Sequence, residues 1–197
     1  KASGVSMYKL SLPVIFAYRE DLKDLYVQTN KTIGSPKLVV FSATPLLYVL
    51  DLLKDQPKPE RQGTIFFPAH SSQHVTVKMD FEVIAEKLVN LDDEYKPITI
   101  CVYWRDFNLG HHLPFQKRGM KIVSAGHVYD PYFLFRFYHL CSMHRYAASN
   151  STGSQLFYSI KSGCSYFHLD IGYSHIFENQ IAIRYDKDLV LESLQSK

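Results

Sequence analysis

The sequence KIVSAGHVYDPYFLFRFYHLCSMHRYAASNSTGSQLFYSIKSGCSYFHL, residues 121–169, decides the fold, because short apolar runs alternate along it with helix-like segments. The pair Asp130-Pro131 supplies an N-cap followed by proline at the first helical position. Gly163 is a typical residue to close a helix. We therefore expect strands at 121–124, 145–148 and 165–169, and helices at 131–144 and 154–162.

The same alternation begins further towards the amino terminus. Asp80 is a good N-cap, and the apolar residues after it recur on one face of a helix: Phe81, Ile84, Ala85, Leu88 and Val89. Strands are expected at 64–67 and 98–104, a short helix at 113–118 and an amphipathic helix at 187–195. Near-continuous apolar strands between helices are typical of a parallel sheet covered on both faces. The predicted fold class is α/β, a Rossmann-like three-layer sandwich with a mostly parallel sheet.

The first third of the chain has a different pattern of apolar and polar residues. Residues 8–36 show no clear period, and a β-branched run at 37–41 precedes a helix-like stretch at 45–54. The segment DQPKPERQ, residues 55–62, is charged and broken by prolines, which is typical of a linker. We expect an N-terminal segment and linker at 1–62, interpreted as the remnant of a preceding domain, and a Rossmann-like domain at 63–197.

Composition and charge exclude several classes of protein. With 46% hydrophobic and 21% charged residues, the 197-residue chain is typical of a globular protein and not of a disordered, collagen-like or coiled-coil one. The net charge of +3 is too small to indicate nucleic-acid binding. Apolar runs fall far short of the roughly 20 residues of a membrane helix, so no integral membrane segment is expected. Three cysteines without a CxxC pair favour a reduced, cytoplasmic setting.

A parallel sheet of this kind binds ligands at the carboxyl ends of its strands, so the loops at those ends are the candidate sites. The loop PAHSSQH, residues 68–74, offers His70 together with the cleft residues Ser71 and Ser72. His70 and His74 are four residues apart but lie outside any predicted helix, so no metal site is expected. A plain polar loop is the alternative interpretation.

The loop SAGHVYD, residues 124–130, contains a second histidine. Gly126 allows a sharp turn, which would bring His127 to the mouth of the sheet as a ligand contact or as a structural histidine. Arg136, in the aromatic helix that follows, would pair either with a diphosphate or with an internal carboxylate. The segment Trp104-Arg105-Asp106 is interpreted as the end of a strand with a surface ion pair, and contact with a ligand is the alternative.

A run of small polar residues between a strand and a helix is the strongest functional signal. Its backbone N–H groups and hydroxyls would be open at a helix N-terminus, where the helix dipole also favours an anion. The run is neither a Walker loop nor GxGxxG. We expect it to bind phosphate, although a well-capped helix is the alternative. The predicted phosphate-binding residues are Ser149, Asn150, Ser151, Thr152, Gly153 and Ser154.

Residues 124–167 resemble the carboxyl-terminal, donor-binding half of GT-B-type glycosyltransferases of bacterial surface-polysaccharide biosynthesis. More distant resemblances are to lipooligosaccharide sialyltransferases and UDP-N-acetylglucosamine 2-epimerases. The likeness depends on the turn SNSTGS, the pair Phe157-Tyr158 and Gly163, and upstream on GTIFFPAHSSQHV, residues 63–75. Cys164 stands where a proline is usual in that family.

The resemblance implies a GT-B donor domain that binds a nucleotide-activated sugar, with a sialic-acid-like sugar among the candidates, and transfers it to a glycan acceptor. The serine-rich turn would hold the donor phosphate. His127 or His70 would be a catalytic group that contacts the donor or offsets charge on the leaving phosphate. Gly126 and Arg136 would belong to the same cleft. The resemblance implies no cofactor and no metal, because no DxD metal site stands in the expected place.

GT-B enzymes also need an amino-terminal Rossmann domain for the acceptor, and residues 1–62 are too few to build one. The chain would then be a fragment, a half-enzyme that pairs with a second copy or a partner subunit, or a relic that binds without catalysis. Two other functions stay open, namely a non-catalytic α/β interaction module and a protein similar to sugar-nucleotide epimerases.

Overall fold

Five strands form one parallel sheet in the computed structural model, in the order β6-β5-β3-β7-β8. The structure describes residues 13–32, 37–72, 75–177 and 182–183. The strands are β3 (Thr64–Phe67), β5 (Ile98–Cys101), β6 (Lys121–Val123), β7 (Tyr146–Ser149) and β8 (Ser165–His168). The helices are α4 (Phe81–Val89), the 3-10 helix η2 (Asp93–Tyr95), α5 (Trp104–Asn108), α6 (Leu113–Lys117), α7 (Phe133–Ser142) and α8 (Ser154–Lys161).

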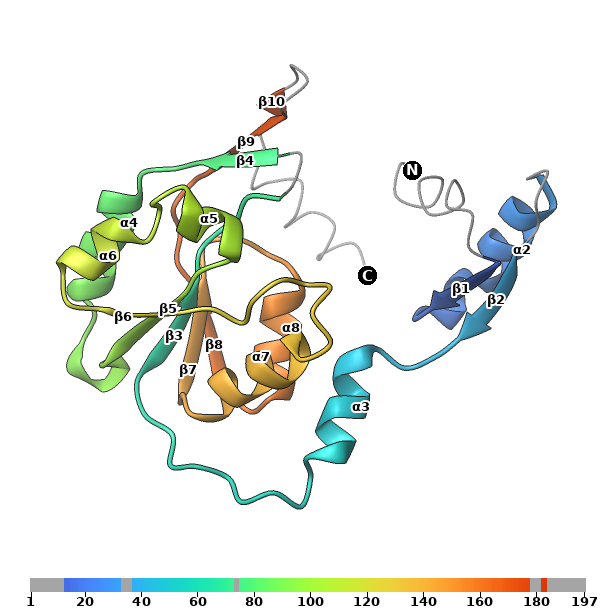
Figure 1. Cartoon of the computed structure of the whole chain (residues 1–197), viewed down its shortest axis with the longest axis horizontal. Coiled ribbons are helices and arrows are strands. Elements are labelled where there is room, and N and C mark those ends of the chain that lie inside the picture. Colours follow the sequence, from blue (N-terminus) through green and yellow to red (C-terminus); the bar gives the residue numbers. More distant parts are fainter. Residues whose placement is uncertain (1–12, 33–36, 73–74, 178–181, 184–197) are drawn as a thin grey trace. The chain divides into compact units, whose positions relative to one another are not determined.

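Helices cover both faces of this sheet. Figure 1 shows α4 and α6 on one side of the strands and α7 and α8 on the other. Alternate residues of β3 point to opposite faces. Phe66 packs into a cluster with α4 and α6, whereas Ile65 and Phe67 pack into a cluster with α7. The prediction of an α/β fold with a parallel, doubly covered sheet is therefore confirmed.

A small antiparallel sheet stands beside the carboxyl edge of the parallel one. Its order is β10-β9-β4, and β4 pairs with β9 so that Val77 lies opposite His175. Its strands are β4 (Val75–Lys78), β9 (Ser174–Phe177) and β10 (Ala182–Ile183). The sequence pattern did not predict these strands. The pairing of β4 with β9 connects the segment that follows β3 to the segment that follows β8.

The chain divides into two compact units, residues 1–52 and 53–197. In the first unit two parallel strands pair in register, with Val14 opposite Leu38. Its elements are β1 (Val14–Ala17), the 3-10 helix η1 (Glu20–Leu22), α2 (Lys23–Thr32), β2 (Leu38–Phe41) and α3 (Pro45–Leu52). The interpretation of residues 8–36 as irregular is wrong over β1 and α2.

Several predicted boundaries shift. The strand expected at 98–104 ends at Cys101, and α5 begins at Trp104. The helix expected at 131–144 covers Phe133–Ser142. The helices expected at 113–118 and 154–162 each end one residue earlier than predicted. The helix expected at 187–195 lies outside the described residues.

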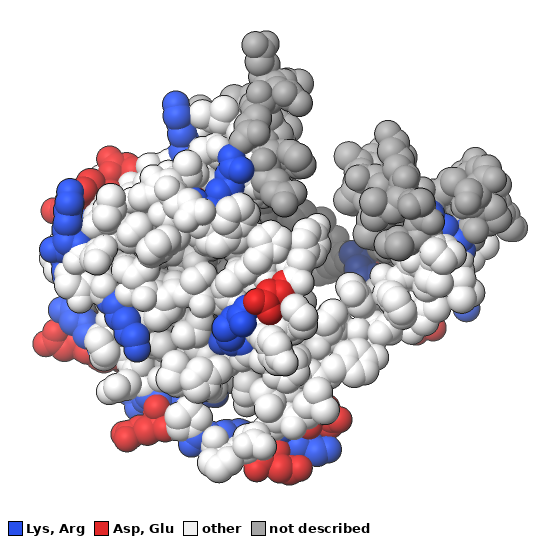
Figure 2. Space-filling model, in the orientation of Figure 1, with Lys and Arg blue, Asp and Glu red and all other residues white. Residues whose placement is uncertain are grey.

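Charged side chains of the second unit are spread around its surface. In the view of Figure 2, blue and red side chains lie mainly around the rim, and no extended patch of one sign covers the described residues on that face. This distribution agrees with the net charge of +3. None of the described helices is long and apolar enough to cross a membrane.

Candidate functional site

The strand order reverses between β3 and β7, because β5 and β6 extend the sheet on one side of β3 and β8 extends it on the other. A reversal of this kind leaves a crevice at the carboxyl ends of the two central strands, which is where open α/β sheets bind ligands. The loop that follows β3 begins at Pro68, and the loop that follows β7 begins at Asn150. Two of the three loops predicted as candidate sites therefore meet at this point.

Asn150 fastens these two loops together. Its side-chain Oδ1 accepts a hydrogen bond from the backbone N–H of Ala69 at 2.8 Å, and the residue is buried. Its Nδ2 donates to Met79 Sδ at 3.3 Å and to the carbonyl of Ile171 at 3.4 Å. The Asn150 amide, expected to contact phosphate, is thus engaged in joining the segments that line the crevice.

The serine-rich turn enters α8 with several open backbone donors. The buried Ser149 Oγ accepts from the N–H of Ser151 at 3.0 Å. The N–H groups of the next four residues, 152–155, have no hydrogen-bond acceptor within the described part of the chain. Four consecutive open donors at the start of an eight-residue helix form a concentrated patch of partial positive charge.

Gln155, which sequence reasoning missed, lies over this turn. Its Nε2 donates to the carbonyl of Ser151 at 3.0 Å and lies 3.1 Å from Ser151 Oγ. Its Oε1 lies 2.5 Å from the position that a Cβ on Gly153 would occupy. Gly153 itself has an extended backbone, with φ −172°, so the absence of a side chain there matters for space and not for backbone strain.

The two histidines expected to be catalytic come from different loops and meet at one aromatic ring. The ring of Tyr103, after β5, lies 5.1 Å from that of His70 and 6.3 Å from that of His127, measured between centroids. Trp104 and Tyr129 lie 5.4 Å and 5.2 Å from His127. We call these five residues the ring cluster. Sequence reasoning missed Tyr103, and it gave Trp104 only as an alternative ligand contact, because the packing of three loops is what brings both rings to the histidines.

The hydrogen bonds of His127 define its tautomer. Its Nδ1 accepts from the backbone N–H of Tyr129 at 3.1 Å. The neutral imidazole must then carry its proton on Nε2, which is left as a donor. His127 therefore holds its own loop through one nitrogen and can offer a hydrogen bond to a ligand through the other.

Arg136 is bound to the loop that carries His127. Its Nη2 donates to Asp130 Oδ2 at 2.6 Å and its Nε to the carbonyl of Ala125 at 2.8 Å. Of the two pairings expected for Arg136, the structure contains the internal carboxylate. The pKa of Asp130 is lowered, first by the N–H of Tyr132 and then by the Arg136 guanidinium.

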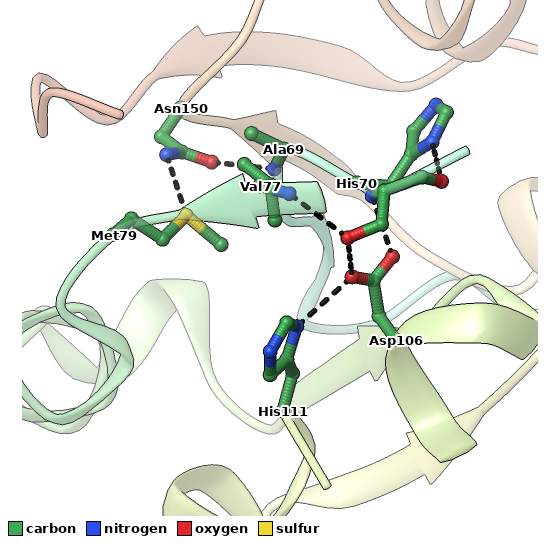
Figure 3. Close-up of polar contacts among 8 residues, drawn as sticks. Ala69, His70, Val77, Met79, Asp106, His111 and Asn150 are labelled. Carbon is green, nitrogen blue, oxygen red and sulfur yellow. Dashed lines mark hydrogen bonds and ion pairs between the residues drawn. The ribbon is translucent and has the colours of Figure 1, made fainter. Parts of the chain in front are cut away.

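Asp106 is the centre of a buried polar cluster and not part of a surface ion pair, so that interpretation of the segment 104–106 is wrong. The residue is only 3% exposed, because it lies in α5 against the loop after β3. One carboxylate oxygen accepts from the N–H of Ser71 at 2.9 Å, and the other accepts from Ser71 Oγ at 2.7 Å and from His111 Nδ1 at 2.9 Å. Figure 3 shows His70 and His111 on either side of this carboxylate.

Ser71, predicted as a cleft residue, is completely buried in this arrangement. Its Oγ also accepts from the N–H of Val77 at 3.0 Å, so it connects β4 to Asp106. Ser72, the other predicted cleft residue, is exposed. The two neighbouring serines therefore differ in role, since Ser71 is buried and hydrogen-bonded within the protein whereas Ser72 is exposed to solvent.

The three cysteines belong to the core. Cys101, Cys141 and Cys164 are free thiols and are all buried in the cluster on the α7 side of the sheet. Burial raises the pKa of Cys101 to about 12. Among the described residues no group of three or more histidine, cysteine, aspartate or glutamate side chains is arranged to hold a metal ion.

In comparisons with known proteins, no family model, curated protein or solved structure matches this chain. The class of protein is therefore defined by the fold, an α/β domain with a five-stranded parallel sheet flanked by helices. The likeness to GT-B donor domains depends on the residues quoted for it from the sequence and stays a prediction.

Proposed function

We propose that residues 53–197 form the donor-binding domain of a GT-B-like glycosyltransferase, which binds a nucleotide-activated sugar for transfer to a glycan acceptor. The observation that supports this most directly is the run of four open N–H groups at residues 152–155, beside the reversal of strand order. A phosphate group accepts several such bonds at once, and a helix N-terminus favours its negative charge.

The ring cluster supports the same proposal. Planar rings such as Tyr103 and the half-buried Trp104 can stack on a nucleobase or on the apolar face of a sugar. His127 can donate from Nε2, and the exposed His70 also lies against Tyr103. In the proposed reaction these two imidazoles contact the donor phosphates and offset the charge that develops on the leaving group.

The experiment is nucleotide binding to wild type and to Gly153→Val, measured by calorimetry with cytidine and uridine phosphates. The backbone at Gly153 suits any residue, and an added Cβ meets only the flexible end of Gln155, so the variant should fold. The branched side chain would cover the open N–H groups and lower nucleotide affinity by about tenfold or more. Gly172→Val is the matched control, because nothing lies within 4 Å of a Cβ there.

Unchanged affinity in a folded Gly153→Val protein would remove the main support for the proposal. The proposed site uses backbone and side-chain groups, so nucleotide binding should also survive treatment with a chelator. Loss of binding in chelator, restored by magnesium or manganese, would contradict the GT-B comparison.

A non-catalytic interaction module is the second candidate, and exposed aromatic and apolar side chains just before α7 and on α8 favour it. Tyr132, just before α7, is 66% exposed, and Phe157 and Ile160 of α8 are 65% and 50% exposed. Such residues are enriched at protein interfaces. This alternative would be supported if the wild-type protein binds none of the nucleotides and if Phe157→Ser lowers its self-association or its binding to a partner.

A further inference from the structure

A small cavity lies between the loops after β3 and β5 and the start of α4. Its volume is about 10 Å³, and its lining includes His70, Phe81, Tyr103, Asp106, His111 and Phe115. A volume near 10–15 Å³ is about what a single water or hydroxyl oxygen occupies. The lining is mostly apolar, so its four polar side chains, those of His70, Tyr103, Asp106 and His111, determine what polar group can enter.

His111 is held in one orientation at the wall of this cavity. The Asp106 carboxylate can only accept, so the Nδ1 bonded to it carries a proton. The ring of His111 also stacks on Phe81, with centroids 4.3 Å apart. Its Nε2 has no hydrogen-bond partner within the described residues. A hydroxyl group can both donate and accept, so it can bond to this nitrogen in either protonation state of the ring.

The cavity adjoins the ring cluster. His70 and Tyr103 line the cavity and also belong to the cluster that includes His127. Figure 3 shows that His70 and His111 lie on either side of Asp106. A ligand that stacks on Tyr103 would therefore be able to place one small polar substituent next to His111.

We propose that this cavity is the subsite for one hydroxyl group of the donor's sugar, hydrogen-bonded by His111 Nε2, with Asp106 as the residue that positions His111. This inference depends on the proposed function, because it assigns the sugar part of the same donor. In this proposal His111 determines which sugar is bound and makes no contact with the nucleotide.

The test compares the affinity of each free nucleotide with that of its sugar conjugate. The ligand pairs are CMP with CMP-N-acetylneuraminic acid, and UDP with UDP-N-acetylglucosamine. In His111→Phe, which keeps a ring against Phe81 but has no nitrogen, the affinity for the preferred conjugate should fall about tenfold, while that for the free nucleotide should not change. His139→Phe, at an exposed position of α7, is the matched control and should change neither affinity.

A second measurement uses the wild-type protein and keeps the proposal testable if His111→Phe does not fold. Conjugates that each lack one sugar hydroxyl should bind with the same affinity as the unmodified conjugate, except for one, which should bind about tenfold more weakly. Equal binding of all deoxy conjugates, or an equal loss of nucleotide and conjugate affinity in His111→Phe, would overturn the subsite. Failure of the wild type to bind any nucleotide would instead overturn the proposed function and the subsite with it.

Discussion

Gly126 and Arg136 show how single residues shape the loop that holds His127. Gly126 has a φ of +88°, a left-handed conformation that side chains rarely adopt. A Cβ there would also lie 2.7 Å from Arg136 Nη2, the atom bonded to Asp130. The absence of a side chain at Gly126 therefore allows Arg136 to reach across the loop and hold it.

The role of His127 can be separated from its place in the loop by His127→Asn. An asparagine side chain can accept the N–H of Tyr129, as Nδ1 does now, so the loop and the melting temperature should be preserved. It is too short to replace the Nε2 donor. We expect nucleotide binding to weaken by about 1.5–3 kcal/mol, the range for a hydrogen bond to a charged group. Calorimetric titration and thermal unfolding of the same variant provide the two measurements.

Asp130→Ala is the matched control for that experiment. It removes the acceptor for Tyr132 N–H and for Arg136 Nη2, so the melting temperature should fall. The bonds of Arg136 to Ala125 and of His127 to Tyr129 remain, so nucleotide affinity should stay close to wild type. If His127→Asn unfolds early and binds normally, the histidine is structural and its proposed catalytic role is wrong.

At the scale of elements, α4 depends on its N-cap. Asp80 Oδ1 accepts from the N–H of Val83 at 3.0 Å, and the helix buries Ile84, Ala85 and Leu88 against the sheet. Replacing Asp80 by alanine leaves that donor without its partner and should lower the free energy of unfolding by about 1 kcal/mol. Denaturant titration measures this loss. Asp80→Asn should lower the free energy of unfolding much less, because asparagine can also cap a helix. Equal decreases in both variants would exclude capping as the cause.

His144 connects the end of α7 to β5 and makes stability depend on pH. Its Nδ1 donates to the carbonyl of Leu140 at 2.6 Å, and its Nε2 lies 3.0 Å from Thr99 Oγ1. Because the Leu140 carbonyl can only accept, the neutral ring takes its second bond from the Thr99 hydroxyl. Burial lowers the pKa of His144, against the smaller raising effect of the Leu140 carbonyl.

The direction of the pH effect follows from that shift. As the pH falls through the ordinary histidine range, the unfolded chain binds a proton at this position before the folded chain does, so the folded state loses stability. We expect His144→Gln to flatten the decline in free energy of unfolding between pH 7 and pH 5 relative to wild type. Denaturant titrations at several pH values test this, and an unchanged slope would contradict it.

At the scale of the whole molecule, the two compact units are joined by an exposed, proline-broken segment. Arg61 ends this segment and belongs to the second unit, since its guanidinium donates to the carbonyls of Ser162 at 2.6 Å and His144 at 3.4 Å. Limited trypsin digestion should therefore cut after Lys54 ahead of other sites in the described residues. Lys58 precedes a proline and should resist.

The fragment that begins at Asp55 should keep the melting temperature of the second unit and its nucleotide affinity. Mass spectrometry identifies the cut, and thermal unfolding and calorimetry on the purified fragment check both properties. A fragment that unfolds on cleavage would show that the first unit is needed for the stability of the second.

Sequence reasoning succeeded where the determining contacts are local. The cap at Asp80 and the apolar stripe after it lie within ten residues, so the pattern alone predicts α4. It failed for α2, because KDLYVQTNKT is mostly polar and has no clear apolar period. It also failed for β4 and β9, whose pairing of Val77 with His175 joins residues that are far apart in the chain.

The sequence by itself determined the parallel α/β class, since short, mostly apolar strands such as β3 and β5 alternate with helices along the chain, and it identified the loops at the strand ends as candidate sites. Only the tertiary structure decided which side chains in those loops are free. Asn150 bonds to Ala69, Ser71 to Asp106 and Arg136 to Asp130. For Asn150 and Ser71 the physical reason is that a buried polar group must find a partner. Where that partner lies 81 or 35 residues away, only the packing of the chain brings the two together.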